Sequence, residues 1–228
     1  MLPAMPAALQ SARKRSIKEA KHALYRERLS DAAEVIFARD GYDATRMQAI
    51  ADEAGLSIAT VYKLYPGKWE LFRAVHDRRG SAMMARVQGR LGELAGRPPL
   101  DLILDGIALY IGFLLEHPDY LRMHLREGGL WASSGSLRSD EQVALWQGGL
   151  TLVAGIFRAA QAQGLLLDDD SPESQGRTMI AMQQARLALW SEGHEPQHPA
   201  RLTRAIQRQF LRAFCPSEVA AEHLASLA

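Results

Sequence analysis

Apolar residues recur every three or four positions along nearly the whole chain, which is the spacing of one buried face of an α-helix. No stretch alternates apolar and polar residues strictly enough to indicate a β-strand. Glycine and proline interrupt the helical pattern at intervals, as they do at helix ends. The pattern therefore predicts an all-α protein.

The segment from residue 45 to 72 predicts two short helices that are joined by a tight turn and followed by a third helix. Thr45 and Ser57 can each accept a hydrogen bond from the free N–H groups at the start of a helix. Gly55 lies between them, where glycine adopts the left-handed backbone of a rapid turn without steric cost. Each helix turns one apolar stripe toward a shared core: Ile50, Ala51, Ala54, Leu56, Val61 and Leu64. An earlier stripe, which ends at Gly41, supplies the third side of that core: Leu29, Ala32, Ala33, Ile36 and Phe37.

Downstream of residue 66, breaks in the pattern divide the chain into longer helices. They are expected at about 67–95, 100–116, 119–127, 140–163, 173–191 and 200–214, with a short helix after Pro216. The expected organisation has three parts: a flexible basic N-terminal arm over 1–22, a helix-turn-helix domain over 23–72 and a larger helical domain over 73–228.

A helix pair of this kind can pack as a plain hairpin, or it can place its second helix in the major groove of DNA. The second helix, over residues 58–65, would be about 12 Å long, which is close to the width of that groove. Tyr62, Lys63, Tyr65 and Lys68 crowd its end and the start of the next helix, where hydroxyls, ammonium groups and a helix N-terminus suit phosphate oxygens. These polar groups favour the DNA-binding interpretation.

The run GYDATRMQAIADEAGLSIATVYKLYPGKWELFRAV resembles the N-terminal DNA-binding domain of the TetR family of transcriptional regulators, and the resemblance covers about the first third of the chain. The positions that fit the family pattern are Gly41, Tyr42, Thr45, Ile50, Ala51, Ala54, Gly55, Leu56, Ser57, Thr60, Val61, Tyr62, Lys68 and Leu71. The chain departs from the pattern at Arg46, Ala59 and Tyr65, so its operator should not be inferred from relatives. The resemblance implies a second domain that binds a small molecule and forms a homodimer, here through helices at about 173–191 and 200–214.

Candidate site residues follow from the pattern together with the resemblance. Contact with double-stranded DNA is predicted for Thr45, Arg46, Gln48, Ser57, Ile58, Ala59, Thr60, Tyr62, Lys63, Tyr65 and Lys68. Contact with a small-molecule effector, hydrophobic or aromatic in character, is predicted for Tyr110, Phe113, Met123, His124, Trp131, Trp146, Met182, Gln183 and Arg186. Burial in the core is the more common role of methionine and aromatic residues on such helices, and it remains the alternative for most of this second set. Gln183 and Arg186 could bind a carboxylate or carbonyl, whereas an ion pair with Glu127 or exposure to solvent is the alternative for Arg186.

Charge and composition limit the kinds of partner and the location expected for the 228-residue chain. Its net charge is only +1, so DNA affinity cannot come from overall charge. The N-terminal basic residues can form a DNA-contacting arm or a solvated tail: Arg13, Lys14, Arg15, Lys18, Lys21, Arg26 and Arg28. The single Cys215 excludes an intramolecular disulfide and suits a reducing cytoplasm. With no apolar run of membrane length and no signal-peptide pattern, we expect a cytoplasmic protein with no membrane partner.

Residues 194–198 read HEPQH and match the letters of a zinc-protease motif, but Pro196 and Pro199 disrupt the continuous helix that the motif requires. No metal site is expected there. The chain also has no G-x-S-x-G, no phosphate-binding glycine loop and no spaced cysteines, so we expect neither an enzyme nor a cofactor. The predicted function is a ligand-responsive repressor that binds a pseudo-palindromic operator as a homodimer. A helix-turn-helix adaptor without DNA binding and a helical enzyme remain alternatives.

Overall fold

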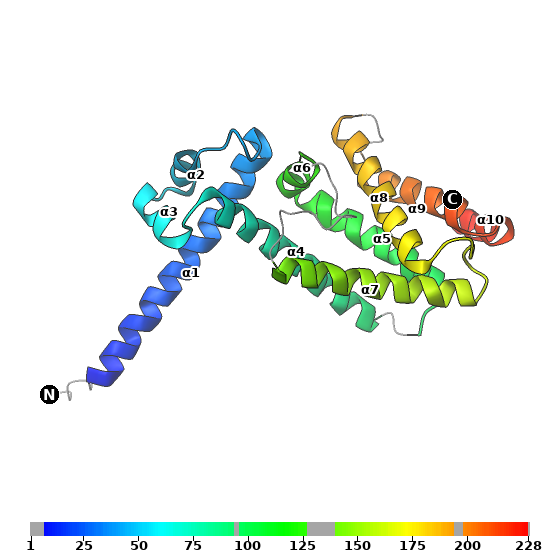
Figure 1. Ribbon diagram of the computed structural model, residues 1–228, viewed down its shortest axis with the longest axis horizontal. Helices are drawn as coiled ribbons and strands as arrows, with labels where there is room; N and C mark the ends of the chain where they lie inside the picture. Colours follow the sequence, from blue (N-terminus) through cyan, green and yellow to red (C-terminus); the bar gives the residue numbers. More distant parts are fainter. Residues whose placement is uncertain (1–6, 94–95, 127–139, 194–197, 228) are drawn as a thin grey trace. The chain divides into compact units, whose positions relative to one another are not determined.

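A computed structural model of the chain describes residues 7–93, 96–126, 140–193 and 198–227. Within these ranges the chain forms ten α-helices and no β-strand, which confirms the predicted all-α class (Figure 1). No helix in the described ranges has the length and apolar character needed to cross a bilayer.

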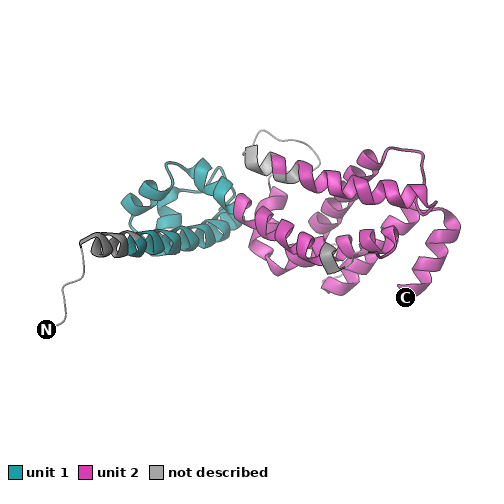
Figure 2. Cartoon of the chain, turned by 90° about the horizontal axis from the view of Figure 1, so that it is seen from below, with its two compact units in different colours: residues 1–75 teal, residues 76–228 magenta. Residues whose placement is uncertain are grey.

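The chain divides into two compact units, unit 1 over residues 1–75 and unit 2 over residues 76–228 (Figure 2). The helix α4, Lys68–Glu93, contributes its first residues to unit 1 and the rest to unit 2. The predicted boundary after residue 72 lies close to this division.

Unit 1 consists of α1 (Ala7–Asp40), α2 (Met47–Ala54), α3 (Ile58–Leu64) and the start of α4. Its core contains the apolar stripes predicted from the sequence, since Leu29, Ile50 and Val61 are all fully buried. Leu56 and Leu64, which were predicted in the same stripes, are only half-buried. The start of α4 completes this core with Leu71, Phe72 and Val75.

The N-terminal segment differs from the expected flexible arm over 1–22, because residues from Ala7 onward belong to α1. The reason is local: after Pro6 the chain is rich in Ala, Lys, Arg and Glu, which favour helix, and it contains no glycine or proline before Gly41. The described side chains of this part of α1 face solvent, and even Ile17 and Leu24 are 59% and 53% exposed.

Unit 2 contains the end of α4 and six further helices in the described residues. They are α5 (Pro99–Glu116), α6 (Pro118–Arg126), α7 (Asp140–Ala162), α8 (Pro172–Ser191), α9 (Pro199–Phe214) and α10 (Ser217–Ser226). Proline occupies the first turn of α5, α8 and α9, where its missing N–H has no helical partner to lose. Ser171 caps α8 by accepting a hydrogen bond from the N–H of Ser174 at 3.2 Å.

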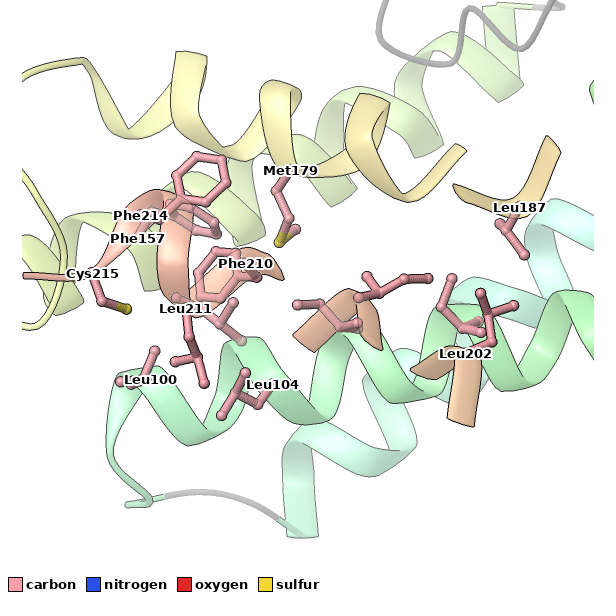
Figure 3. Close-up of a cluster of buried hydrophobic side chains, with 14 of the residues drawn as sticks. Leu100, Leu104, Phe157, Met179, Leu187, Leu202, Phe210, Leu211, Phe214 and Cys215 are labelled. Atoms are coloured by element: carbon pink, nitrogen blue, oxygen red, sulfur yellow. The ribbon is translucent and has the colours of Figure 1, made fainter. Parts of the chain in front are cut away.

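The core of unit 2 lies among α5, α7, α8 and α9 (Figure 3). Leu202, Phe210 and Phe214 project from one side of α9 toward residues of the other three helices. Cys215 follows α9 and is buried, and burial raises the pKa of its thiol to about 11. Because a protonated thiol is a poor nucleophile, Cys215 is a packing residue.

Candidate nucleic-acid interface

The short helix α3 is held firmly at both ends. The Ser57 hydroxyl accepts a hydrogen bond from the N–H of Thr60 at 3.2 Å, and the two hydroxyl oxygens lie 2.8 Å apart. At the other end, the N–H of Tyr65 donates to the carbonyl of Val61 at 2.9 Å. Val61 is fully buried, so it fixes which side of α3 faces the core. Ser57 thus has the capping role that the sequence predicts.

The opposite side of α3 is open to solvent. Ala59, Tyr62 and Lys63 are exposed, while Ile58 and Thr60 are half-buried. Tyr62 is 51% exposed, so its ring and hydroxyl are accessible on this side of α3. No acidic residue belongs to α3, and Lys63 lies in its last turn. This exposed side can approach phosphate and base edges without electrostatic repulsion.

The turn between α2 and α3 depends on Gly55, whose φ of 62° and ψ of 38° are left-handed. The N–H of Leu56 reaches back to the carbonyl of Ala51 at 2.9 Å and closes the end of α2. A guanidinium nitrogen of Arg28 donates to the carbonyl of Ala54 at 2.6 Å. Arg28 therefore braces the helix pair from α1, a role that the sequence analysis missed when it grouped this residue with the basic arm.

Two of the predicted DNA contacts, Thr45 and Lys68, have internal roles. Thr45 is 3% exposed, and its hydroxyl donates to the carbonyl of Gly41 at 2.6 Å instead of capping α2. The ammonium of Lys68 donates to the carbonyls of Tyr42, Asp43 and Thr45 at 2.6, 3.0 and 3.0 Å. It also lies 4.5 Å from the centroid of the Tyr42 ring. An ammonium has three N–H donors, and in this structure Lys68 directs them to backbone carbonyls. Its contact with a phosphate stays a prediction.

The other predicted contacts lie at the surface of α2 and beside α3. Arg46 is exposed at the N-cap of α2, where its side chain makes no capping hydrogen bond. Gln48 is exposed and donates to the Asp52 carboxylate, one turn further along α2, at 2.7 Å. Tyr65 is half-buried at the end of α3. Arg46 and Lys63 are thus the predicted cationic contacts that remain available on this surface.

Comparison with known proteins shows where this arrangement of helices occurs. A family model described as bacterial regulatory proteins of the tetR family matches residues 29–75, from the buried part of α1 to the start of α4. Residues 29–75 therefore match the DNA-binding domain of the TetR family. Members of this family are DNA-binding transcriptional regulators, and the expectation that the chain is no enzyme agrees with this match.

Similar proteins extend the match beyond the family model. The HTH-type transcriptional repressor KstR of Mycobacterium tuberculosis is 34% identical over 144 residues, which are 63% of this chain and 61% of that repressor. The matched parts of three further curated relatives are 35%, 38% and 32% of their lengths. The chain therefore spans less than two thirds of each of these relatives.

Solved structures show the same fold over most of the chain. The ketosteroid transcriptional regulator KstR2 of Mycobacterium tuberculosis has a TM-score of 0.65 and 16% identity, covering 84% of this chain and 95% of that chain. A gamma-butyrolactone receptor, described as an ArpA-like protein, has a TM-score of 0.65 and 18% identity, covering 91% of this chain and 96% of that one. Unit 2 therefore shares its fold with the corresponding part of these two structures.

The predicted effector residues occupy several environments in unit 2. Phe113, Met123, His124 and Gln183 are at most 3% exposed, whereas Tyr110 and Met182 are half-buried against the core. Phe113 stacks on His117, with ring centroids 4.5 Å apart. Trp131 lies outside the described residues, and so does the side chain of Trp146 on α7.

The predicted pair on α8, Gln183 and Arg186, does not share one environment. Gln183 is buried, with 2% of its surface exposed, and its side-chain oxygen has no hydrogen-bond partner among the described residues. Arg186 is half-buried and lines a surface groove with residues of α9. A buried amide oxygen without a partner is costly in a folded protein, so Gln183 is the stronger candidate for contact with a bound ligand.

Proposed function

We propose that this chain is a ligand-responsive repressor of the TetR family that binds a pseudo-palindromic operator as a homodimer. The observation that carries the proposal is α3 itself, a capped short helix with Tyr62 and Lys63 exposed and no acidic residue. The match to a curated transcriptional repressor at 34% identity supports repression over activation. On this proposal α3 enters the major groove, while Arg46 at the start of α2 contacts the backbone.

The spacing of major grooves on one face of DNA supports a two-fold dimer. A two-fold axis can place two copies of α3 in successive major grooves, about 34–36 Å apart, and so match a palindromic site. The exposed face of α8 offers a surface for such contact, because Ala181 and Ala185 are exposed and Leu189 is 41% exposed. Small residues let two helices approach closely, and Leu189 would lose its contact with water.

The effector is proposed to be mainly apolar with at least one hydrogen-bond donor. Met123 and Phe113 supply apolar surface, and the unpaired oxygen of Gln183 would accept a hydrogen bond from a ligand hydroxyl or N–H group. His124 is 1% exposed on α6 and adds a second buried polar residue to this set. A ligand that satisfies a buried amide gains more than the same hydrogen bond contributes in water.

The proposed switch runs through α4, because this helix contributes residues to both units. A ligand that favours one position of the unit 2 part of α4 would change the spacing of the two DNA-binding units in a dimer. The operator affinity then falls by the ratio of the ligand's affinities for the two states. The ligand must therefore bind the DNA-free state more tightly.

Selection of bound sequences from a random DNA pool tests the proposal. The expected result is an inverted repeat whose half-sites lie about 10–10.5 base pairs apart or a multiple of that spacing. The selected complex should weaken steeply as salt rises, because phosphate contacts release counterions. A pool that shows no enrichment, even in low salt, would contradict the proposal and favour an adaptor without DNA binding.

The same selected site tests the role of α3. Lys63→Ala and Thr60→Ala should change the preference among half-site sequences, since these side chains would lie at base edges. A matched substitution on α2, Glu53→Ala, should leave that preference unchanged because Glu53 is exposed and is not among the predicted DNA contacts. If all three variants selected the same sequences, α3 would not be the helix that contacts the base edges.

A further inference from the structure

The first part of α1 continues beyond the core of unit 1 as an exposed helix (Figure 1). The core begins at Leu29, so the part of α1 from Ala7 to Arg28, here called the α1 extension, precedes it and is about 33 Å long. Its described side chains, over residues 16–28, are exposed or half-buried. The family model begins at residue 29, so the extension lies outside the matched DNA-binding domain. Packing within unit 1 therefore does not explain the length of this helix.

One side of the α1 extension, here called the basic side, carries groups that suit phosphate oxygens. These residues follow one another at intervals of three or four positions and therefore share one side of the helix: Lys18, Lys21, Tyr25 and Arg28. The ammonium of Lys21 lies 5.3 Å from the centroid of the Tyr25 ring, as expected for neighbours on one side. Glu19 follows Lys18 directly and Glu27 lies two positions after Tyr25, so both carboxylates project from other sides.

The basic side is continuous with the side of α1 that packs in unit 1. After Tyr25 the same intervals lead to three residues that are buried in the core: Leu29, Ala32 and Ile36. Arg28 lies at the edge of this row, and its guanidinium donates to the carbonyl of Ala54, at the end of α2. At residue 28, α1 thus passes the turn between α2 and α3. The basic side therefore leaves unit 1 close to the N-terminus of α3, the end of a recognition helix that contacts base edges.

We propose that the basic side of the α1 extension binds the sugar-phosphate backbone of DNA beside the half-site that α3 contacts. This inference rests on the proposed function, because it requires α3 to lie in the major groove. Ammonium and hydroxyl groups donate to phosphate oxygens whatever the base sequence, so this contact adds affinity without sequence preference. Lys18 lies about 15 Å along the helix from Arg28. That length corresponds to about four base pairs of flanking DNA.

An anionic lipid surface fits the α1 extension less well than DNA does. A helix that lies on a membrane needs a broad apolar face beside its basic one. In residues 16–28 the aliphatic side chains larger than alanine are Ile17 and Leu24, which lie two turns apart and form only a narrow line. A DNA backbone requires no apolar face, and the position of the basic side close to the start of α3 favours DNA.

Two duplexes that carry the selected operator test this contact with the full chain. One duplex ends at the inverted repeat, and the other continues for about ten base pairs on each side, which is enough to span the extension. The wild type should bind the longer duplex about tenfold more tightly, with a salt slope steeper by about two to four, since each phosphate contact adds about one. The double variant Lys18→Gln/Lys21→Gln should lose most of this difference between the duplexes.

The matched control Arg26→Gln/Arg39→Gln also removes two exposed charges from α1, one on another side of the extension and one at the opposite end of the helix. It should keep the wild-type difference, and circular dichroism checks that both variants remain helical. Equal affinity of the wild type for the two duplexes, or an equal loss in both double variants, would overturn this inference while leaving operator binding by α3 intact. Binding to phosphatidylserine vesicles in place of the flank effect would overturn it in favour of a lipid surface. If the wild type bound neither duplex, the proposed function itself would be contradicted.

Discussion

At the scale of single residues, Lys68 shows that a side chain whose chemistry suits a phosphate can instead bind groups inside the protein. A lysine beside a DNA-reading helix suits a phosphate, yet its ammonium lies within 3.0 Å of three backbone carbonyls in the connection from α1 to α2. Those carbonyls precede α2 and have no helical N–H to accept from. Lys68 therefore stabilises the connection that positions the helix pair.

Replacement of Lys68 by Met should lower the free energy of unfolding by about 1–3 kcal/mol, because the carbonyls lose a charged donor while the aliphatic stem is retained. Operator affinity should also fall, but its dependence on salt should stay the same, since no phosphate contact is lost. Arg46→Met is the matched control, because Arg46 is exposed and is the proposed backbone contact; it should reduce the salt slope by about one without changing stability. A shallower salt slope for the Lys68 variant would restore its role as a phosphate contact.

Gln183 allows a second test at this scale. Its side-chain oxygen is buried and has no partner in the described residues, so replacement by Leu should leave the free energy of unfolding unchanged or raise it by about 1 kcal/mol. Gln207 is the matched control, because its amide donates to the carbonyl of Leu104 at 2.9 Å. Gln207→Leu should be destabilising by about 1–3 kcal/mol.

Chemical denaturation of both variants without ligand provides the measurement. Equal destabilisation would mean that Gln183 has a structural partner, and its assignment to the effector site would then lose its support. A stabilised Gln183→Leu variant would fit a residue retained for ligand binding at some expense of stability.

At the scale of helices, the sequence was sufficient where proline and glycine mark the boundaries. The helix expected at about 100–116 is Pro99–Glu116, and the helix expected at about 200–214 is Pro199–Phe214. These boundaries are local, since proline restricts its own backbone and that of its predecessor. The start of α1 also follows a proline, Pro6, and it was missed because the basic residues of this segment were interpreted as a flexible arm.

Contacts between distant residues could not be predicted in the same way. Arg28 and the carbonyl of Ala54 are 26 positions apart in the sequence, and so are Lys68 and Tyr42. Each pairing depends on how the helices of unit 1 pack, and the local pattern contains no signal for it.

The turn at Gly55 gives a prediction at this scale. Gly55→Ala should destabilise unit 1 by about 1 kcal/mol or more, because an alanine at φ of 62° is strained and its Cβ would lie 2.9 Å from Arg28 Nη2. The matched control is Gly106→Ala in the middle of α5, where an added Cβ meets nothing within 4 Å. That control should stabilise the protein by about 0.4–1 kcal/mol.

Thermal unfolding and operator binding together check this pair. Gly55→Ala should lose affinity for the operator as well as stability, since Arg28 and the turn position α3. If Gly55→Ala were as stable as Gly106→Ala and bound the operator normally, the left-handed turn would not control the helix pair.

At the scale of the whole molecule, the proposed activity requires two chains. A single copy of α3 spans about one half-site, and the affinity of a pseudo-palindromic operator depends on joining two copies in one complex. The exposed face of α8 is the proposed contact, with Ala181, Ala185 and Leu189 as its described residues. A substitution on such a self-complementary surface enters the interface twice, once from each copy.

Substitution of Ala185 by Arg should shift the protein from dimer to monomer, because the new charge is placed at the interface of both copies at once. Sedimentation velocity at micromolar concentration measures the shift, and Ala162→Arg, an equal change on the exposed end of α7, should remain dimeric. The monomeric variant should bind an isolated half-site as the wild type does but lose most of its affinity for the full operator. Unchanged half-site binding together with weaker full-operator binding would show that the substitution affects assembly and leaves DNA recognition intact. A variant that stays dimeric would place the interface elsewhere on unit 2, and a variant that loses half-site binding would show that unit 1 had been disturbed.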